Sequence, residues 1–150
     1  MTKNLAKLEQ EIIEEFTQFS TIDEKYTHLF KLGDALPEMN PALKTEENRV
    51  KGCDSTVWFH LEYANGRLQL QADSDSMVIK GLTALLIRLI ADCRPDEIRE
   101  INFDFLNEMK IWKLASHRNA GLNALLDHIK TKVQLINPDH NEPISEEASL

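Results

Sequence analysis

The sequence predicts an α+β fold in which a small three-stranded antiparallel sheet packs against helices. Apolar residues recur every three or four positions in several segments, which is the periodicity of helices that bury one face. Between these segments, Asn65-Gly66 separates two runs of strand-forming residues, which is a strong signal for a β-hairpin. The chain has 150 residues, 42% of them hydrophobic, and this is enough for one domain with its own core.

Two helices are expected before the hairpin. The first follows an apolar stripe along residues 5–19. Residues 21–24 have the spacing of a capping box, so a second helix should begin there and end at Gly33, which readily adopts a left-handed cap conformation. Two prolines then prevent the helix from continuing, which indicates that residues 34–48 form a connecting loop.

The hairpin is expected to pair residues 56–63 with residues 67–72. Both runs are rich in β-branched, aromatic or alternating apolar residues. An isolated hairpin is only marginally stable, so the sheet needs a further strand and a helical layer. Residues 49–51, just before Cys53, are the candidate for that third strand.

Three helices are expected after the hairpin. Residues 73–76 supply N-cap candidates for a long helix that ends before Pro95 and is apolar on most faces, so this helix should be central. Gly81 within it is interpreted as a site of close packing. A shorter helix is predicted over residues 104–112, and a last one over residues 116–133, with Ser116 as its N-cap.

Residues 1–136 are expected to form the domain, and residues 137–150 an acidic, disordered tail. The tail has four acidic residues, no lysine or arginine, and no apolar period. The whole chain carries a formal net charge of -8 at pH 7, which disfavours binding to nucleic acids and to anionic membrane surfaces. We recognise neither a targeting leader nor an apolar stretch that could cross a bilayer, so the expected location is the cytoplasm.

The two cysteines have different surroundings in the sequence. Cys53 lies in a polar turn beside Gly52 and close to the bases Arg49 and Lys51, which favours an accessible thiolate. Burial as a small hydrophobic residue is the alternative for Cys53. Cys93 lies at the C-terminal end of the most apolar helix, where the helix dipole disfavours a thiolate, and is interpreted as a packing residue.

The other ionisable residues indicate no metal or cofactor site. None of the five histidines is singled out as a base for Cys53, and no cluster of thiolate and imidazole ligands indicates zinc. Asp73 and Asp75 are interpreted as residues of a helix cap rather than as calcium ligands. Arg118 near the start of the last helix opposes the helix dipole, which indicates either a carboxylate or carbonyl partner or plain exposure to solvent.

Three segments resemble motifs of the SufE/CsdE family of sulfur-acceptor proteins. Residues 47–58 (ENRVKGCDSTVW) resemble its E-N-x-V-x-G-C-x-S-x-V-W signature. Residues 73–82 (DSDSMVIKGL) resemble its D-S-D-x-x-I-V-K-G-L stretch. Residues 116–122 (SHRNAGL) are similar to its L-x-x-S-R-x-x-G-L helix start, with His117 inserted or substituted between the serine and the arginine. The resemblance extends over residues 16–129 with the motifs in the same order, which is more specific than any single motif.

The resemblance implies a fold shared with the iron–sulfur scaffold IscU and a cysteine, here Cys53, that accepts sulfane sulfur as a persulfide. The donor would be a pyridoxal-phosphate cysteine desulfurase of the SufS/CsdA type, which the protein would stimulate. The recipient would be a scaffold complex for iron–sulfur cluster assembly or another sulfur acceptor. Pyridoxal phosphate would belong to the desulfurase, and this chain is expected to need no cofactor and to turn over no substrate alone. Candidate supporting residues are Gly52, Ser55 and Trp58 around the acceptor loop, and Asp73, Asp75 and Arg118 toward a partner.

Because a persulfide is easily oxidised or reduced, we expect the turn of residues 52–55 to move and to shelter Cys53 against apolar side chains, with Trp58 as a candidate wall.

Two other functions are weighed against the sulfur acceptor. A self-contained thiol enzyme of the hydrolase or peroxidase type would use Cys53 as its nucleophile but needs an adjacent histidine or an oxyanion site. A pure adaptor would keep both cysteines as structural residues.

Overall fold

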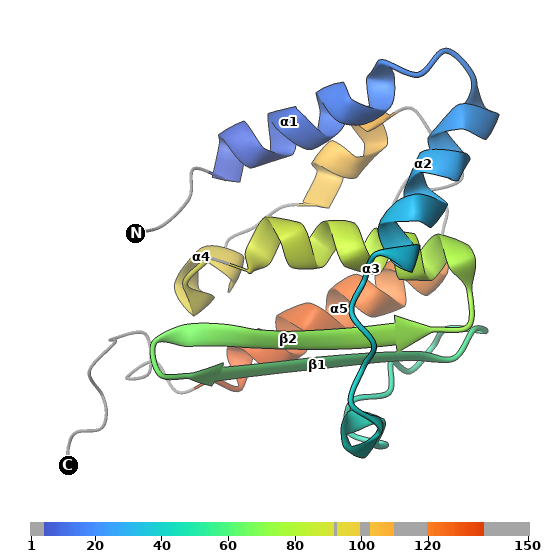
Figure 1. Cartoon of the computed structure of the whole chain (residues 1–150). Helices are drawn as coiled ribbons and strands as arrows, with labels where there is room; N and C mark the ends of the chain where they lie inside the picture. The colour runs from blue at the N-terminus through green and yellow to red at the C-terminus, as the bar shows by residue number, and fades with distance from the viewer. Residues whose placement is uncertain (1–4, 92, 100–102, 110–119, 137–150) are drawn as a thin grey trace.

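The computed structural model describes residues 5–91, 93–99, 103–109 and 120–136, and it has the α+β architecture that the sequence predicts (Figure 1). A β-hairpin lies beneath a layer of helices, and α3 runs between the hairpin and α1. Over these residues, no helix combines the length and the apolar content of a membrane span. The elements are α1 (Leu5–Thr17), α2 (Ile22–Asp34), the 3-10 helix η1 (Pro41–Leu43), β1 (Val57–Ala64), β2 (Arg67–Ser74), α3 (Met77–Ile90), α4 (Pro95–Arg99), the 3-10 helix η2 (Phe103–Met109) and α5 (Ala120–Gln134).

The predicted hairpin is confirmed. Strands β1 and β2 are antiparallel, with a register that runs from Val57 opposite Ser74 to Ala64 opposite Arg67. Asn65 and Gly66 both have positive φ angles, 57° and 75°, as a two-residue hairpin turn of this kind requires. The Asn-Gly pair therefore fixes the register and decides which side chains of each strand face the helices.

The predicted third strand is wrong as a strand, because the segment makes only an isolated bridge. Arg49 is paired with Trp58, and two backbone hydrogen bonds flank the pair. The Val50 N–H donates to the Val57 carbonyl at 2.8 Å, and the Phe59 N–H donates to the Asn48 carbonyl at 2.8 Å. A turn precedes this segment and the positive φ of the glycine at position 52 follows it, so pairing stops after one bridge. In the described part of the chain, the sheet is two-stranded.

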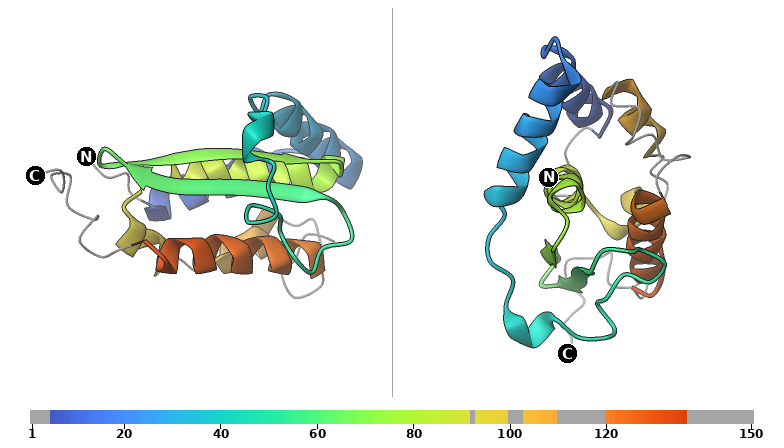
Figure 2. Two further views of the ribbon diagram at one scale, coloured as in Figure 1. Left: turned by 90° about the horizontal axis from the view of Figure 1, so that it is seen from below. Right: turned by 90° about the vertical axis from the view of Figure 1, so that its right-hand side faces the viewer.

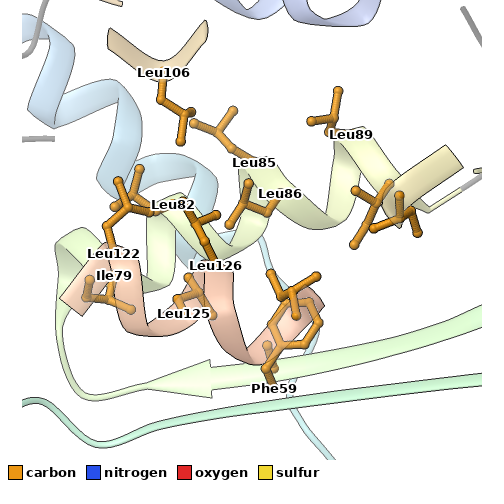
Figure 3. Packing of buried hydrophobic residues seen from close by; sticks show 14 of the residues in the cluster. Phe59, Ile79, Leu82, Leu85, Leu86, Leu89, Leu106, Leu122, Leu125 and Leu126 are labelled. Carbon is orange, nitrogen blue, oxygen red and sulfur yellow. The ribbon is translucent and has the colours of Figure 1, made fainter. Parts of the chain in front are cut away.

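The core lies between the inner face of the hairpin and the helices. Alternate residues of β1 point inward, and the side chains of Val57 and Phe59 are fully buried. Helix α3 packs on β2 and α5 packs on β1, and Figure 3 shows Phe59 beneath leucines of both helices. The prediction that the long apolar helix is central is confirmed. Its buried residues are Ile79, Gly81, Leu82, Thr83, Leu85, Leu86, Leu89 and Ile90.

Helix α2 packs closely on α3. It begins with the predicted capping box, in which Thr21 and Glu24 bond each other's backbone N–H groups. The predicted packing role of Gly81 is confirmed, because a Cβ atom there would lie 2.4 Å from the carbonyl oxygen of Leu29. The predicted role of Gly33 as a left-handed cap is wrong. Gly33 lies inside α2, which ends at Asp34, and its lack of a side chain lets the backbone of α3 approach.

The helices after α3 differ in part from the prediction. Helix α4 was not predicted; it begins at Pro95, which suits the first position of a helix. The segment predicted as a helix over residues 104–112 forms η2 up to Met109, and residues 110–112 lie outside the described part. The last helix is confirmed from Ala120 onward. Its predicted start at Ser116 and the predicted tail of residues 137–150 lie outside the described residues.

Candidate functional site

The predicted acceptor cysteine lies in a turn between the isolated bridge and β1. Gly52 has a φ of 87°, a conformation that a residue with a side chain rarely adopts, so glycine sets the direction in which the chain enters the turn. The side chain of Cys53 is partly buried and packs against the hydrophobic core, whereas Asp54 is exposed. This arrangement shelters the sulfur on one side and leaves it close to solvent on the other.

The second cysteine is a packing residue, as its sequence context predicts. Cys93 is 5% exposed, and its thiol donates a hydrogen bond to the carbonyl of Leu89 at 3.4 Å. It lies after the end of α3, whereas Cys53 precedes β1. The structure therefore contains one cysteine that another molecule can approach and one that it cannot.

Thr56, which follows the turn, is hydrogen-bonded to residues that precede α3. The Thr56 N–H donates to Oδ1 of Asp75 at 3.1 Å, and the Asp75 N–H donates to the Thr56 carbonyl at 3.2 Å. The hydroxyl of Ser74 donates to the same carbonyl at 2.9 Å. Among the residues expected to cap α3, Ser76 is the N-cap, because its hydroxyl accepts from the N–H of Ile79. Asp75 therefore positions the loop rather than the helix.

The other wall of the turn is α5. A Cβ atom at Gly52 would lie 3.7 Å from the Cβ of Ala124, so the turn passes close to this helix. Between the two lies an open hollow of about 520 Å³. In Figure 2, the view from the right-hand side shows the segment before β1 reaching across to α5. The hollow is lined by Lys51, Gly52, Ala120, Asn123, Ala124, Asp127, His128 and Thr131.

His128 is a half-buried residue in the lining of this hollow, and its imidazole ring is a candidate proton acceptor. Its Nε2–H donates to the carbonyl of Phe59 at 3.1 Å, and its ring meets the ring of Phe59 edge to face. Burial lowers the pKa of His128, the nearby charges of Lys132 and Lys51 lower it further, and the Phe59 carbonyl only partly opposes them. The sequence reasoning missed this residue as part of the site. A usable signal was the spacing of Ala120, Ala124 and His128 on one face of the helix.

Two of the predicted supporting residues lie on the outer face of the hairpin, opposite the helices. The ammonium of Lys44 lies 5.2 Å from the ring centroid of Trp58 and 2.9 Å from Oδ2 of Asp73. Partial burial opposes ionisation of Asp73, but Lys44, the Ser74 N–H and Lys80 outweigh it and lower its pKa. The structure thus brings Gly52, Cys53, Ser55 and Asp75 together and places Trp58 and Asp73 elsewhere. Arg118 lies outside the described residues.

The chemistry of the site is that of a thiol. Within the described ranges, no group of three or more histidine, cysteine, aspartate or glutamate side chains could hold a metal ion. Of the charged residues near the turn, Lys51 forms an ion pair with Glu46. Across the described part of the chain, no side-chain base forms a hydrogen bond with Cys53. Among the described residues, the reactive group of the turn is therefore the partly buried thiol of Cys53.

The fold and the site define a small α+β domain that carries one partly sheltered cysteine on a glycine turn. The chain belongs to the SufE family, because the family model described as an Fe-S metabolism associated domain matches residues 10–133. This confirms the resemblance that the motifs indicate and associates the protein with iron–sulfur metabolism.

A solved structure has a similar fold. It is the solution structure of a hypothetical protein from Thermus thermophilus, with 18% sequence identity and a TM-score of 0.65. The match covers 85% of this chain and 93% of that chain. At this identity the likeness concerns the fold alone.

Proposed function

We propose that this protein is a sulfur acceptor and carrier, which takes sulfane sulfur from a cysteine desulfurase on Cys53 and passes it on for iron–sulfur cluster assembly. The observation that carries the proposal is the pair of cysteines in a chain of the SufE family: Cys53 is partly sheltered on a glycine turn, and Cys93 is 5% exposed. The donor is a pyridoxal-phosphate enzyme of the SufS/CsdA type, and the protein stimulates that enzyme by removing its sulfur.

The transfer is an analogue of thiol–disulfide exchange. The Cys53 thiolate attacks the terminal sulfur of the donor's persulfide, a new S–S bond forms on Cys53, and the donor cysteine leaves as a thiolate. No electrons are gained or lost overall, so the acceptor needs no cofactor of its own. Pyridoxal phosphate acts only in the desulfurase, where the sulfur is first released from free cysteine.

Shelter of the sulfur favours a carrier over a self-contained enzyme. The core side of the turn keeps a persulfide away from oxidants and reductants between encounters. In the described part of the chain, Cys53 has no hydrogen-bonded base, which a hydrolase or peroxidase of the thiol type would need. We therefore infer a carrier that acts together with a partner rather than an enzyme that acts alone. The reducing cytoplasm is the compartment in which both cysteines remain thiols.

The test is to incubate the protein with a cysteine desulfurase and free cysteine and then to measure its intact mass. Wild type and Cys93→Ser should gain the mass of sulfur, and Cys53→Ser should not. A Cys53→Ser variant that still gains sulfur would refute the proposal. Turnover of an ester or a peroxide without a partner would instead identify a thiol enzyme. Neither sulfur gain nor turnover in wild type would identify an adaptor.

A further inference from the structure

The hollow beside the turn is large enough to admit a second molecule next to the residue that precedes Cys53. It has a volume of about 520 Å³, it is open to solvent, and its lining includes Gly52, the residue before Cys53. Ala124 lies beside Gly52, and His128 lies one helical turn further along the same face of α5. A group that enters this hollow therefore lies beside the turn and in contact with the ring of His128.

The hydrogen bond to β1 fixes which nitrogen of His128 can accept a proton. Its Nε2 atom carries the hydrogen that the Phe59 carbonyl accepts at 3.1 Å. In the neutral ring the other nitrogen, Nδ1, then has a free lone pair. The bond also holds the ring in place, because both Phe59 and the body of α5 belong to the buried core.

The surroundings keep this ring neutral near pH 7. The charged groups near it are Lys132 and Asp127 on α5 and Lys51 on the turn, and β1 presents a backbone carbonyl. Burial lowers the pKa of His128 first, and the two lysines lower it further. A neutral imidazole can take a proton, whereas the protonated ring cannot.

We propose that the hollow admits the thiol that takes sulfur away from Cys53, and that Nδ1 of His128 accepts the proton of this thiol. The acceptor sulfur forms a bond to the terminal sulfur of the Cys53 persulfide, and the S–S bond to Cys53 breaks. Cys53 leaves as a thiolate, and the acceptor carries the new persulfide. The proton moves to His128 and then to solvent, and no oxidant or reductant is needed. This inference rests on the proposed function and assigns the delivery step to a separate residue.

The experiment measures delivery alone, with Cys53 loaded chemically so that no desulfurase is needed. The Cys53 mixed disulfide with 5-thio-2-nitrobenzoate is treated with hydrosulfide, which displaces the aromatic thiolate and leaves the persulfide. The loaded protein is mixed with 2-mercaptoethanol at several pH values, and the loss of one sulfur atom is followed by mass spectrometry. Failure of desulfurase loading and failure of delivery are thus separate results.

The informative variant is His128→Gln. A glutamine amide can still donate to the Phe59 carbonyl, but it cannot accept the proton of a thiol. His60→Gln is the matched control, because His60 lies on β1 with its ring bonded to Asn48 and Glu62 on the opposite face. His60→Gln should deliver at the wild-type rate. Circular dichroism should show that both variants are folded.

Near neutral pH, wild type should deliver sulfur at least about ten times faster than His128→Gln, as expected for the loss of a general base. The ratio of the two rates should fall toward one as the pH rises above the pKa of 2-mercaptoethanol, because the thiol is then already ionised. Equal rates at neutral pH would overturn the proposal. A ratio that is the same at every pH would also overturn it, because that result indicates a purely structural role.

A short peptide with one cysteine distinguishes two sources of the acceptor thiol. Delivery to this peptide and to 2-mercaptoethanol should both depend on His128. A faster reaction with the peptide would support the proposal with a protein cysteine as the acceptor, and a faster reaction with 2-mercaptoethanol would support it with a small thiol. A reaction with either probe that does not slow in His128→Gln would contradict the role of this residue.

Discussion

The two faces of the hairpin are held in different ways. The inner face presents Val57, Phe59 and Ala72 to α3 and α5, and these side chains are at most 2% exposed. The outer face is crossed by the segment of residues 35–48, here called the strap, which buries the side chain of Met39 and also makes polar contacts. The Asn40 N–H donates to the side chain of Gln71 at 2.8 Å, and Lys44 binds Asp73 and lies over Trp58.

The turn that carries Cys53 lies at the boundary between the strap on the outer face of the hairpin and the helices on its inner face. The chain crosses the outer face as the strap, makes one bridge to β1, and turns inward at Gly52 to pass close to α5 (Figure 2). Apolar packing fixes the inner face by shape and area, whereas exposed polar contacts are individually weak. Cys53 therefore lies where the segment that crosses the outer face meets the apolar core.

The largest expected effect is on the inner face. Phe59→Ala should lower the free energy of unfolding by about 3–5 kcal/mol, because it leaves a cavity in the core. Trp58→Ala, at the next position of the same strand but on the outer face, should cost about 1–2 kcal/mol through lost partial burial and the contact with Lys44. Urea denaturation measures both values. Equal losses would show that the two faces contribute equally to stability.

At the boundary, Gly52→Ala should cost about 1–2 kcal/mol, because alanine is strained at the observed φ of 87°. Gly66→Ala is a matched control, since Gly66 has a φ of 75° in the hairpin turn. Both variants should lose similar stability, but only Gly52→Ala should slow the loading of Cys53 by a desulfurase. If Gly66→Ala slowed loading as much, the conformation of the Cys53 turn would have no special role.

The smallest effect is expected on the outer face. Asp73→Asn should cost less than about 1 kcal/mol at pH 7, because half-exposed ion pairs are weak. The folded-state pKa of Asp73 is lowered, so its contribution is present above the ordinary pKa and is lost as the pH falls through the lowered value. Acid denaturation curves of wild type and Asp73→Asn should therefore converge at low pH. Curves that stay parallel would show that this carboxylate does not contribute through its charge.

Local signals in the sequence predicted most of the fold. The Asn65-Gly66 turn sets a register that needs no distant contact, and Thr21 with Glu24 caps a helix through its own backbone. The glycine in α3 was predicted as a packing site, but the glycine in α2 was assigned a local role. Gly33 instead faces α3, and a pattern of residues near it in the sequence does not show which element will pack there.

The candidate site was predictable only in part. The sequence indicated Cys53 because a glycine, a polar turn and a family motif occur together there. The hollow could not be predicted, because it exists only where Gly52 meets Ala124 in the folded chain. The shortened third strand has a similar reason. Its length is decided by how far the chain can follow β1 before Gly52 turns it toward α5.

The most direct test of the central claim compares the two cysteines within one wild-type molecule. After a single reaction with a desulfurase and free cysteine, the protein is alkylated and digested, and the peptides that contain Cys53 and Cys93 are analysed by tandem mass spectrometry. We expect the additional sulfur on the Cys53 peptide and none on the Cys93 peptide. Sulfur on the Cys93 peptide, or on neither, would contradict this claim.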